Sequence, residues 1–287
     1  MSAVTRFVFA LFIALTCSPV FASEHLALKI DIAGRQRMLT QRMVRSACFI
    51  AMEVDVKAHQ KLLEDSAALF VSSLSELKTS GGFNHLEPAT DPNILLQIGL
   101  IESLWDPFDQ QISEQLNARR IGFEQLSRLS DAGERLLKAS NDLVLLFERE
   151  ANAVGAHLDP QQAKLVNLSG RQRMLLQRMG KQTCLASISS SGEENEAFLA
   201  LQETSQMFHS TAFNLTFGAP DAGFPPSPND HILEVNATIW QHWAVMDAIL
   251  QGVGEKALTE KELQELSWDI EAMYVDLDAV VKLYADL

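Results

Sequence analysis

The chain carries one ten-residue motif twice, and this duplication constrains its fold more than any other feature. The motif reads GRQRMLTQRM at residues 34–43 and GRQRMLLQRM at residues 170–179, so the two copies differ at a single position. Such a repeat within one chain indicates two similar structural units rather than one. We place these units at residues 23–152 and 153–287.

Matching residues elsewhere indicate that the repeat spans most of the chain. At a separation of 136 residues, or 135 near the middle, the matched sets are Gly34 with Gly170, Cys48 with Cys184, Asp142 with Asp278, and Trp105 and Phe108 with Trp240 and Trp243. Because these matches fall near the start, the middle and the end of each half, the two halves are expected to fold alike.

Both halves read as helical. Near the end of each half, apolar residues recur every three or four positions, as on the buried face of a helix. These residues are Leu126, Leu129, Leu136, Leu137, Leu143, Val144 and Phe147, and then Leu263, Leu266, Ile270, Met273, Leu277, Val280 and Tyr284. No alternating stretch is long enough to predict a sheet.

Local signals predict where the helices begin and how they are grouped. Capping residues followed by proline predict helix starts at Asp91, Asp159 and Ser227. Thr259 and Glu262 together predict a capping box. The connectors KTSGGFNHLEPATDP and TFGAPDAGFPPSP divide each half into two helical hairpins. We therefore predict an all-α fold of two tandem up-and-down four-helix bundles related by pseudo-twofold symmetry.

The N-terminal sequence predicts export. Residues 1–22 combine Arg6, an apolar run and a small residue, Ala22, at the expected cleavage site, which is typical of a secretory signal peptide. A lipoprotein signal at Cys17 fits poorly, because Thr16 is larger than the residue that normally precedes a lipidated cysteine. No later apolar run approaches the roughly 20 residues needed to span a bilayer. We expect a soluble, exported protein, periplasmic in a Gram-negative source.

Composition limits the classes of function. The net charge of −14 disfavours nucleic acid and anionic membranes as partners of the whole surface. No nucleophile elbow, phosphate loop or pair of catalytic carboxylates is recognisable, so we do not expect an enzyme. The histidines lack metal-ligand spacing with acidic or cysteine companions, so neither a metal nor another cofactor is expected.

On a helical wheel with 100° per residue, the motif helix has two different faces. One is a core stripe formed by Ile32, Leu39, Met43, Ala47 and Ile50. The opposite face, where solvated charge would be usual, holds Ile30, Gly34, Arg37, Met38, Gln41 and Cys48, and in the second half Val166, Gly170, Arg173, Met174, Gln177 and Cys184. A helix with two semi-apolar faces is expected to pack against two neighbours.

The second face has the chemistry of an anion site. Glycine inside a helix costs about 1 kcal/mol relative to alanine, so Gly34 and Gly170 indicate close approach by a helix or a ligand. If the two faces meet across the pseudo-twofold axis, Arg37 and Arg173 face each other. An oxyanion between them would relieve their repulsion and accept charge-assisted hydrogen bonds. The simpler alternative is that these arginines pair with acidic residues of the bundle.

The two motif segments resemble the signature of PilJ-type domains, the N-terminal domains of type IV pili chemotaxis transducers. These domains are related to the periplasmic sensors of NarX-type nitrate/nitrite histidine kinases. The resemblance covers the first helix of each half strongly and the other helices only in length and pattern. It implies a nitrate or nitrite ion between the first helices, held by Arg37 and Arg173 and approached by the backbone near Gly34 and Gly170.

Further residues are expected around this ion. Met38 and Met174 are predicted to line the site, and the supporting neighbours are Arg35, Arg171, Gln41 and Gln177. Receptors of the family flank the sensor with transmembrane helices and signalling modules, whereas here two sensors are fused in tandem. We therefore expect a built-in dimer that reports to a membrane receptor, kinase or transporter partner, with further homodimerisation left open.

Two other functions compete with this interpretation. The first is a periplasmic interaction adaptor whose exposed arginine faces dock an acidic partner without any small ligand. The second is a heme- or metal-binding bundle with axial ligands that face inward.

Cys48 and Cys184 project from the arginine face about three turns further along. A disulfide between them is conceivable, although buried free thiols are the commoner outcome. Trp105, Trp240 and Trp243 are expected to anchor the core rather than to form a ligand cage.

Overall fold

The computed structural model describes residues 19–80, 82, 84–117, 121–152, 158–188, 196–254 and 258–287. Its α-helices are α1 (Pro19–Ala51), α2 (Val56–Glu76), α3 (Pro92–Asn117), α4 (Phe123–Asn152), α5 (Pro160–Ile188), α6 (Glu196–Phe217), α7 (Asp230–Gln251) and α8 (Glu260–Ala285). Two short 3-10 turns, η1 (Pro220–Ala222) and η2 (Gly252–Gly254), complete the described elements. Within these ranges the extended structure is limited to one isolated bridge between Ala219 and Phe224. The prediction of an all-α fold is confirmed.

Two expected boundaries fall at gaps in the description. The predicted signal peptide lies outside the described residues except for its last four, which form the start of α1. The predicted junction between the halves adjoins residues 153–157, which also lie outside them. Across the described ranges, the structure contains no helix with both the length and the apolarity to cross a membrane.

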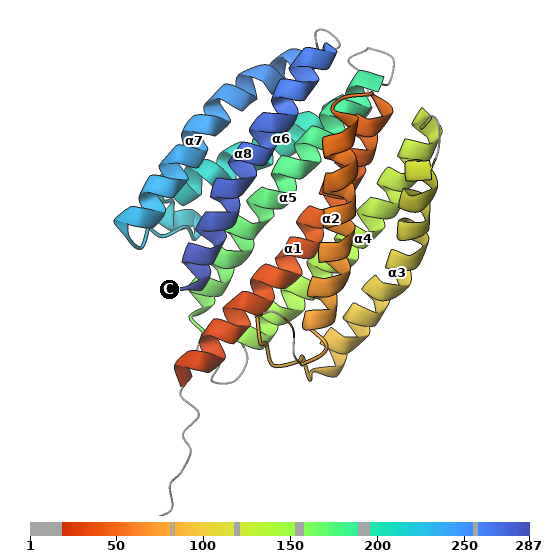
Figure 1. Ribbon diagram of the computed structural model, residues 1–287. Coiled ribbons are helices and arrows are strands. Elements are labelled where there is room, and N and C mark those ends of the chain that lie inside the picture. The colour runs from red at the N-terminus through yellow and green to blue at the C-terminus, as the bar shows by residue number, and fades with distance from the viewer. Residues whose placement is uncertain are drawn as a thin grey trace, which may run out of the picture.

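The helices form two bundles that share a central helix pair (Figure 1). In the first bundle α1 packs against α2 and α4, and α3 packs against α4. In the second bundle α5 packs against α6 and α8, and α7 packs against both of these. The most extensive helix–helix contact joins the bundles, because α1 and α5 lie side by side between them (Figure 1). The predicted tandem arrangement is therefore present, with the two motif helices at its centre.

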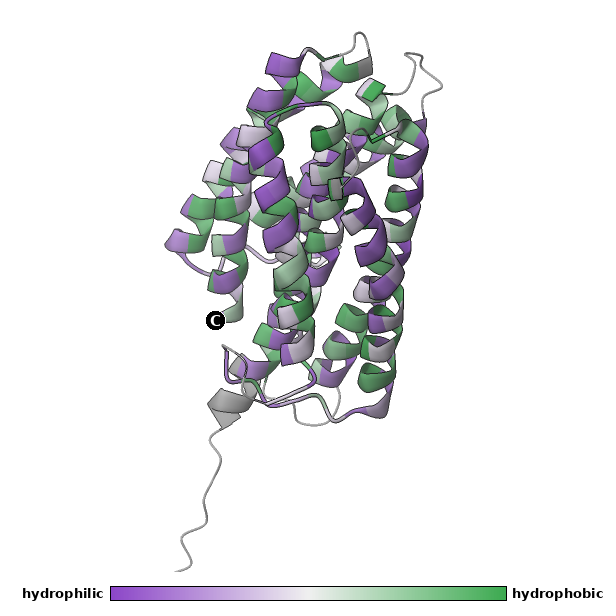
Figure 2. Cartoon of the chain, turned by 45° about the vertical axis from the view of Figure 1, so that its right-hand side comes forward, coloured by the Kyte–Doolittle hydropathy of each residue, from purple (hydrophilic) through white to green (hydrophobic). Residues whose placement is uncertain are grey.

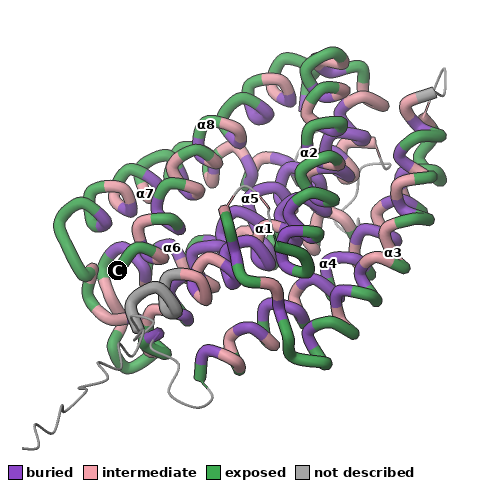
Figure 3. The backbone as a smooth tube through the Cα atoms, turned by 60° about the horizontal axis from the view of Figure 1, so that its bottom comes forward, coloured by how far each residue is buried: buried purple, intermediate pink, exposed green. Residues whose placement is uncertain are grey.

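Burial follows from this arrangement. The central helices α1 and α5 are buried along nearly their whole length, whereas the outer helices keep one exposed side (Figure 3). Colouring by hydropathy shows hydrophilic and hydrophobic residues alternating around the outer helices, as expected for amphipathic helices (Figure 2). Even the polar side chains of Gln36, Gln41, Gln172 and Gln177 are at most 1% exposed. The prediction that the motif helix packs on two sides is confirmed.

Most predicted helix starts are correct. Asp91 and Asp159 cap α3 and α5, because each side chain accepts a hydrogen bond from the second backbone N–H beyond it. Thr259 and Glu262 form the predicted capping box of α8. The predicted start at Ser227 is wrong, because Asn229 caps α7 instead. The Asn229 side chain accepts a hydrogen bond from the backbone N–H of Ile232.

The aromatic residues act as core anchors, as predicted. The Trp105 ring stacks on Phe70 with centroids 4.4 Å apart, and the Trp243 ring lies 4.6 Å from that of Phe208. Trp243 is fully buried, and Trp105 and Trp240 pack against the core from partly exposed positions. Each bundle thus has an aromatic pair between its second and third helices.

The register of the last helix in each half differs from the sequence match. The buried residues of α4 and α8 superimpose when they are offset by 137 residues, as for Leu126 with Leu263 and Phe147 with Tyr284. Asp278 therefore corresponds to Asn141. The pairing of Asp142 with Asp278 is wrong, because Asp142 lies on the exposed side of α4.

Two equivalent ionic contacts cross from one half to the other. Glu271 on α8 accepts hydrogen bonds from Arg42 and Arg45 on α1. In the corresponding place, Glu134 on α4 contacts Arg178 at 3.3 Å and Lys181 at 2.5 Å on α5. Burial would raise the pKa of Glu271, but the Arg45 and Arg42 guanidinium groups outweigh it and lower that pKa. Each carboxylate therefore stays ionised and attaches the outer helix of one half to the motif helix of the other.

A disulfide between Cys48 and Cys184 joins α1 to α5 directly. Their Cα atoms are 6.2 Å apart, and both residues are completely buried. The expectation of free thiols is wrong, because the pseudo-twofold packing brings equivalent positions of two parallel helices next to each other.

We expect the double substitution Cys48→Ala and Cys184→Ala to lower the free energy of unfolding by about 3 to 5 kcal/mol, because it opens a long covalent loop in the unfolded chain. Urea denaturation under oxidising conditions measures this loss. Full reduction of the unfolded wild type before refolding should reproduce it. Equal stability of the variant and the oxidised wild type would contradict the crosslink.

Candidate functional site

The guanidinium groups of Arg37 and Arg173 lie together at the contact between α1 and α5. A methyl group added at Gly34 would lie 3.2 Å from Arg37 Nη2 and 4.0 Å from Arg173 Nη2. One added at Gly170 would lie 3.4 Å from Arg173 Nη2 and 3.8 Å from Arg37 Nη2. Both arginines therefore pack over both glycines, and the missing side chains leave the room that they occupy.

The charge of Arg173 is compensated by two carboxylates. Its Nη2 donates to Asp31 Oδ1 on α1 at 2.5 Å, and its Nη1 donates to Asp278 Oδ1 on α8 at 2.6 Å. Burial would lower the pKa of Arg173, but Asp31 and Asp278 outweigh it and raise that pKa. This guanidinium is thus held as a cation by the protein itself.

Arg37 has no such compensation, although it is only 2% exposed. Its Nη1 donates to the side-chain oxygen of Asn141 at 3.1 Å, and its Nη2 to the backbone carbonyl of Asn167 at 3.4 Å. Burial, followed by repulsion from Arg173 and Arg171, lowers the pKa of Arg37 to about 9. Since a guanidinium seldom releases its proton in a protein, this low pKa reflects a buried charge for which attraction by Glu148 and Asp31 does not outweigh burial and repulsion.

The two arginine environments are related by the pseudo-twofold axis and differ by a pair of substitutions. Asn141 on α4 corresponds to Asp278 on α8, and Asn167 on α5 corresponds to Asp31 on α1. Each arginine therefore contacts one residue of its own half and one from the motif helix of the other. Arg173 bonds both aspartate side chains, whereas Arg37 bonds the side chain of Asn141 and only the backbone carbonyl of Asn167.

Additional buried polar atoms surround the pair. Within the described residues, Arg37 Nε, Arg173 Nε and both polar atoms of the Gln177 amide have no hydrogen-bond partner. Both amide atoms of Gln41, one turn beyond Arg37, are likewise buried without a partner within hydrogen-bond distance among the described residues. Buried donors without partners are uncommon in proteins and usually bind water or a ligand.

The other predicted site residues divide into two groups. Met38 and Met174, which directly follow the two arginines in the sequence, are buried in the core at 0% and 6% exposure. Arg35 and Arg171 do not join the pair. Arg35 Nη2 donates to Asp31 Oδ2 at 3.1 Å, and Arg171 is exposed with its Nη2 3.6 Å from the Met207 sulfur.

Sequence reasoning missed Asp31, Asn141 and Asn167, and it matched Asp278 to the wrong residue. One signal was available, because Asp31 and Asn167 stand at the repeat separation of 136 residues just before the motif. The role of Asn141 had no comparable signal, since it depends on the shifted register of the last helix.

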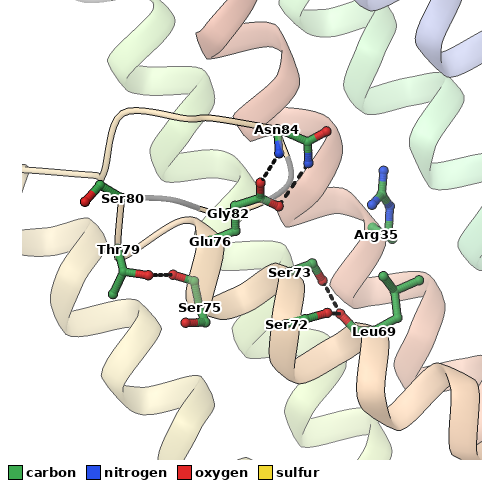
Figure 4. A pocket seen from close by; sticks show the side chains of 10 residues that line it. All are labelled: Arg35, Leu69, Ser72, Ser73, Ser75, Glu76, Thr79, Ser80, Gly82 and Asn84. Carbon is green, nitrogen blue, oxygen red and sulfur yellow. Dashed lines mark hydrogen bonds between the residues drawn. The ribbon is translucent and has the colours of Figure 1, made fainter.

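A solvent-open cavity of about 440 Å³ lies between α1, α2 and the segment after α2 (Figure 4). Arg35 and several hydroxyl groups line it, and at its far side Glu76 accepts hydrogen bonds from the backbone and side chain of Asn84 (Figure 4). Because Asp31 contacts both Arg35 and Arg173, one carboxylate connects this surface cavity to the buried pair.

Two further observations bear on the competing functions. The adaptor hypothesis required exposed arginine faces, and it is wrong on this point because Arg37 and Arg173 are buried. In the part of the chain that the structure describes, no three His, Cys, Asp or Glu side chains are grouped so that they could hold a metal ion.

Comparison with protein families gives a match that covers most of the chain. Residues 20–128 and 160–267 each match the family PilJ, described as the type IV pili methyl-accepting chemotaxis transducer N-terminal domain. No curated protein and no solved structure matches the chain significantly.

We expect Asp31→Asn to lower the free energy of unfolding by roughly 3 kcal/mol, because it removes a buried partner of Arg173. Chemical denaturation followed by circular dichroism measures the change. The matched control is Glu124→Gln, which removes an exposed ion pair with Arg128 and should cost only about 0.5 kcal/mol. If the two variants were equally stable, the Arg173–Asp31 pair would contribute nothing.

Proposed function

The chain belongs to the PilJ family, in two tandem copies, and on that premise we propose that it is a sensory protein that binds nitrate or nitrite between α1 and α5. In this proposal the ion lies at the pair formed by Arg37 and Arg173, with the glycine backbones of both motifs beside it. The protein presents or reports the ion and catalyses no reaction.

The observation that carries the proposal is the buried, uncompensated charge of Arg37 next to that of Arg173. Burying one charge without a partner is costly, and placing a like charge beside it adds repulsion. A bound anion offsets both the cost of burial and the repulsion. A planar oxyanion suits the site, because the guanidinium donors are rigid, planar and arranged to meet oxygen atoms.

Access to the site requires movement, since both guanidinium groups are buried. The disulfide fixes α1 to α5 at Cys48 and Cys184, beyond the motif. Opening is therefore easiest toward the N-terminal ends of the two helices, where Asp31 and Asn167 each contact the motif arginine of the other half. Binding there would shift α1 against α5, and the outer helices would carry that shift to a partner.

The predicted signal peptide at residues 1–22 supports export to the periplasm. The family description as a transducer N-terminal domain supports signalling through a membrane receptor, and a kinase or a transporter component would serve the same role. The fused repeat supplies the paired sensor within one chain, and further homodimerisation is compatible with it.

A thermal-shift titration with sodium nitrate, nitrite and chloride tests the proposal. A ligand that binds only the folded state raises the melting temperature, because it stabilises that state by about 2.7 kcal/mol at a hundred times the dissociation constant and by more at higher concentration. We expect the melting temperature to rise with the logarithm of the nitrate or nitrite concentration and much less with chloride.

The Arg37→Ala variant should lose this rise, as should the double variant Arg37→Ala and Arg173→Ala. Arg128→Ala, at an exposed arginine, is the matched control and should retain it. Circular dichroism checks that each variant is folded. The proposal fails if no oxyanion shifts the wild type, or if the shift is unchanged in folded Arg37→Ala.

A further inference from the structure

We propose that the two arginines of this site are not equivalent. Arg37 binds a single monovalent anion, whereas Asp31 and Asp278 already compensate the charge of Arg173. This inference rests on the proposed function of the same site. It adds that Asn141 and Asn167 determine where the anion binds and which charge it carries.

The contacts of the two arginines support this division. Arg173 is bound through both terminal nitrogens to carboxylate oxygens at 2.5 and 2.6 Å. Arg37 contacts only neutral oxygens, the side-chain oxygen of Asn141 at 3.1 Å and the backbone carbonyl of Asn167 at 3.4 Å. Binding at Arg173 would require an anion to displace an aspartate from an existing buried ion pair, whereas at Arg37 it displaces only neutral oxygens, so an incoming anion gains more at Arg37.

The choice of asparagine has a specific consequence. Asparagine has almost the same shape as aspartate, and Asn141 Oδ1 still accepts a hydrogen bond that orients Arg37. Because the amide carries no charge, the guanidinium is positioned without being neutralised. Aspartate at the same place would act as an internal anion and compete with the ligand.

Other charged groups around Arg37 do not replace a ligand. Glu148 on α4 is the main carboxyl group that attracts it, but burial raises the pKa of Glu148, and its carboxyl group is hydrogen-bonded to the side chain of Asn167. Arg171 and Arg173 both repel Arg37. One negative charge matches the one poorly compensated cation, whereas a dianion such as sulfate would bury a second charge without a partner.

The test moves one carboxylate by a single residue at constant net charge. The variant combines Asn141→Asp with Asp142→Asn, so that the exposed carboxylate of Asp142 is exchanged for one facing Arg37. Asp142→Asn alone is the matched control. The reciprocal variant Asp278→Asn gives Arg173 the neutral partner that Arg37 now has.

Two readouts are compared, the melting temperature without ligand and the dissociation constant for nitrate from isothermal titration calorimetry. We expect the Asn141→Asp/Asp142→Asn variant to melt higher than the Asp142→Asn control and to bind nitrate at least tenfold more weakly. Asp278→Asn should melt lower than wild type and still bind nitrate. In the wild type, one nitrate should bind per chain, and sulfate should not compete for it.

The outcomes separate this inference from the proposed function. If the wild type binds nitrate but the exchanged carboxylate leaves both the affinity and the melting temperature unchanged, the division between the halves is overturned and anion binding stands. Two nitrates per chain, or equal competition by sulfate, would also overturn it. If the wild type binds no anion, the proposed function fails and this inference fails with it.

Discussion

The structure depends on two like charges that are buried side by side between parallel helices. Arg37 and Arg173 repel each other, and water is excluded from both, so the rest of the interface must hold α1 and α5 together against that cost. The disulfide, the Glu134 and Glu271 contacts and the ion pair between Arg173 and Asp31 do so. An interface assembled around such a pair is well suited to respond to an anion.

Fusion of the two repeats explains how the halves could come to differ. In a symmetric dimer of identical chains, each substitution appears twice, so both arginines would meet the same partners. In a tandem chain the two copies change independently. Aspartate could therefore close one half while asparagine keeps the other receptive, without a change in the fold.

The sequence was sufficient for the features that depend on local pattern. The helical periodicity, the caps of α3, α5 and α8, and the second face of the motif helix all follow from spacing and composition, and the structure agrees with them. Features that depend on the relative register of packed helices could not be predicted from the sequence. The match of Asn141 to Asp278 requires the 137-residue register of α4 and α8, and the disulfide requires the parallel packing of α1 on α5. Whether Arg37 and Arg173 had acidic partners was likewise decided by residues from four different helices.

A crystal structure of the protein soaked with nitrate tests the central claim most directly. The account predicts one planar anion bound to the guanidinium of Arg37, with Asp31 and Asp278 still paired to Arg173. An anion shared equally by the two arginines after displacement of Asp31, or no anion at Arg37 at saturating nitrate, would contradict it.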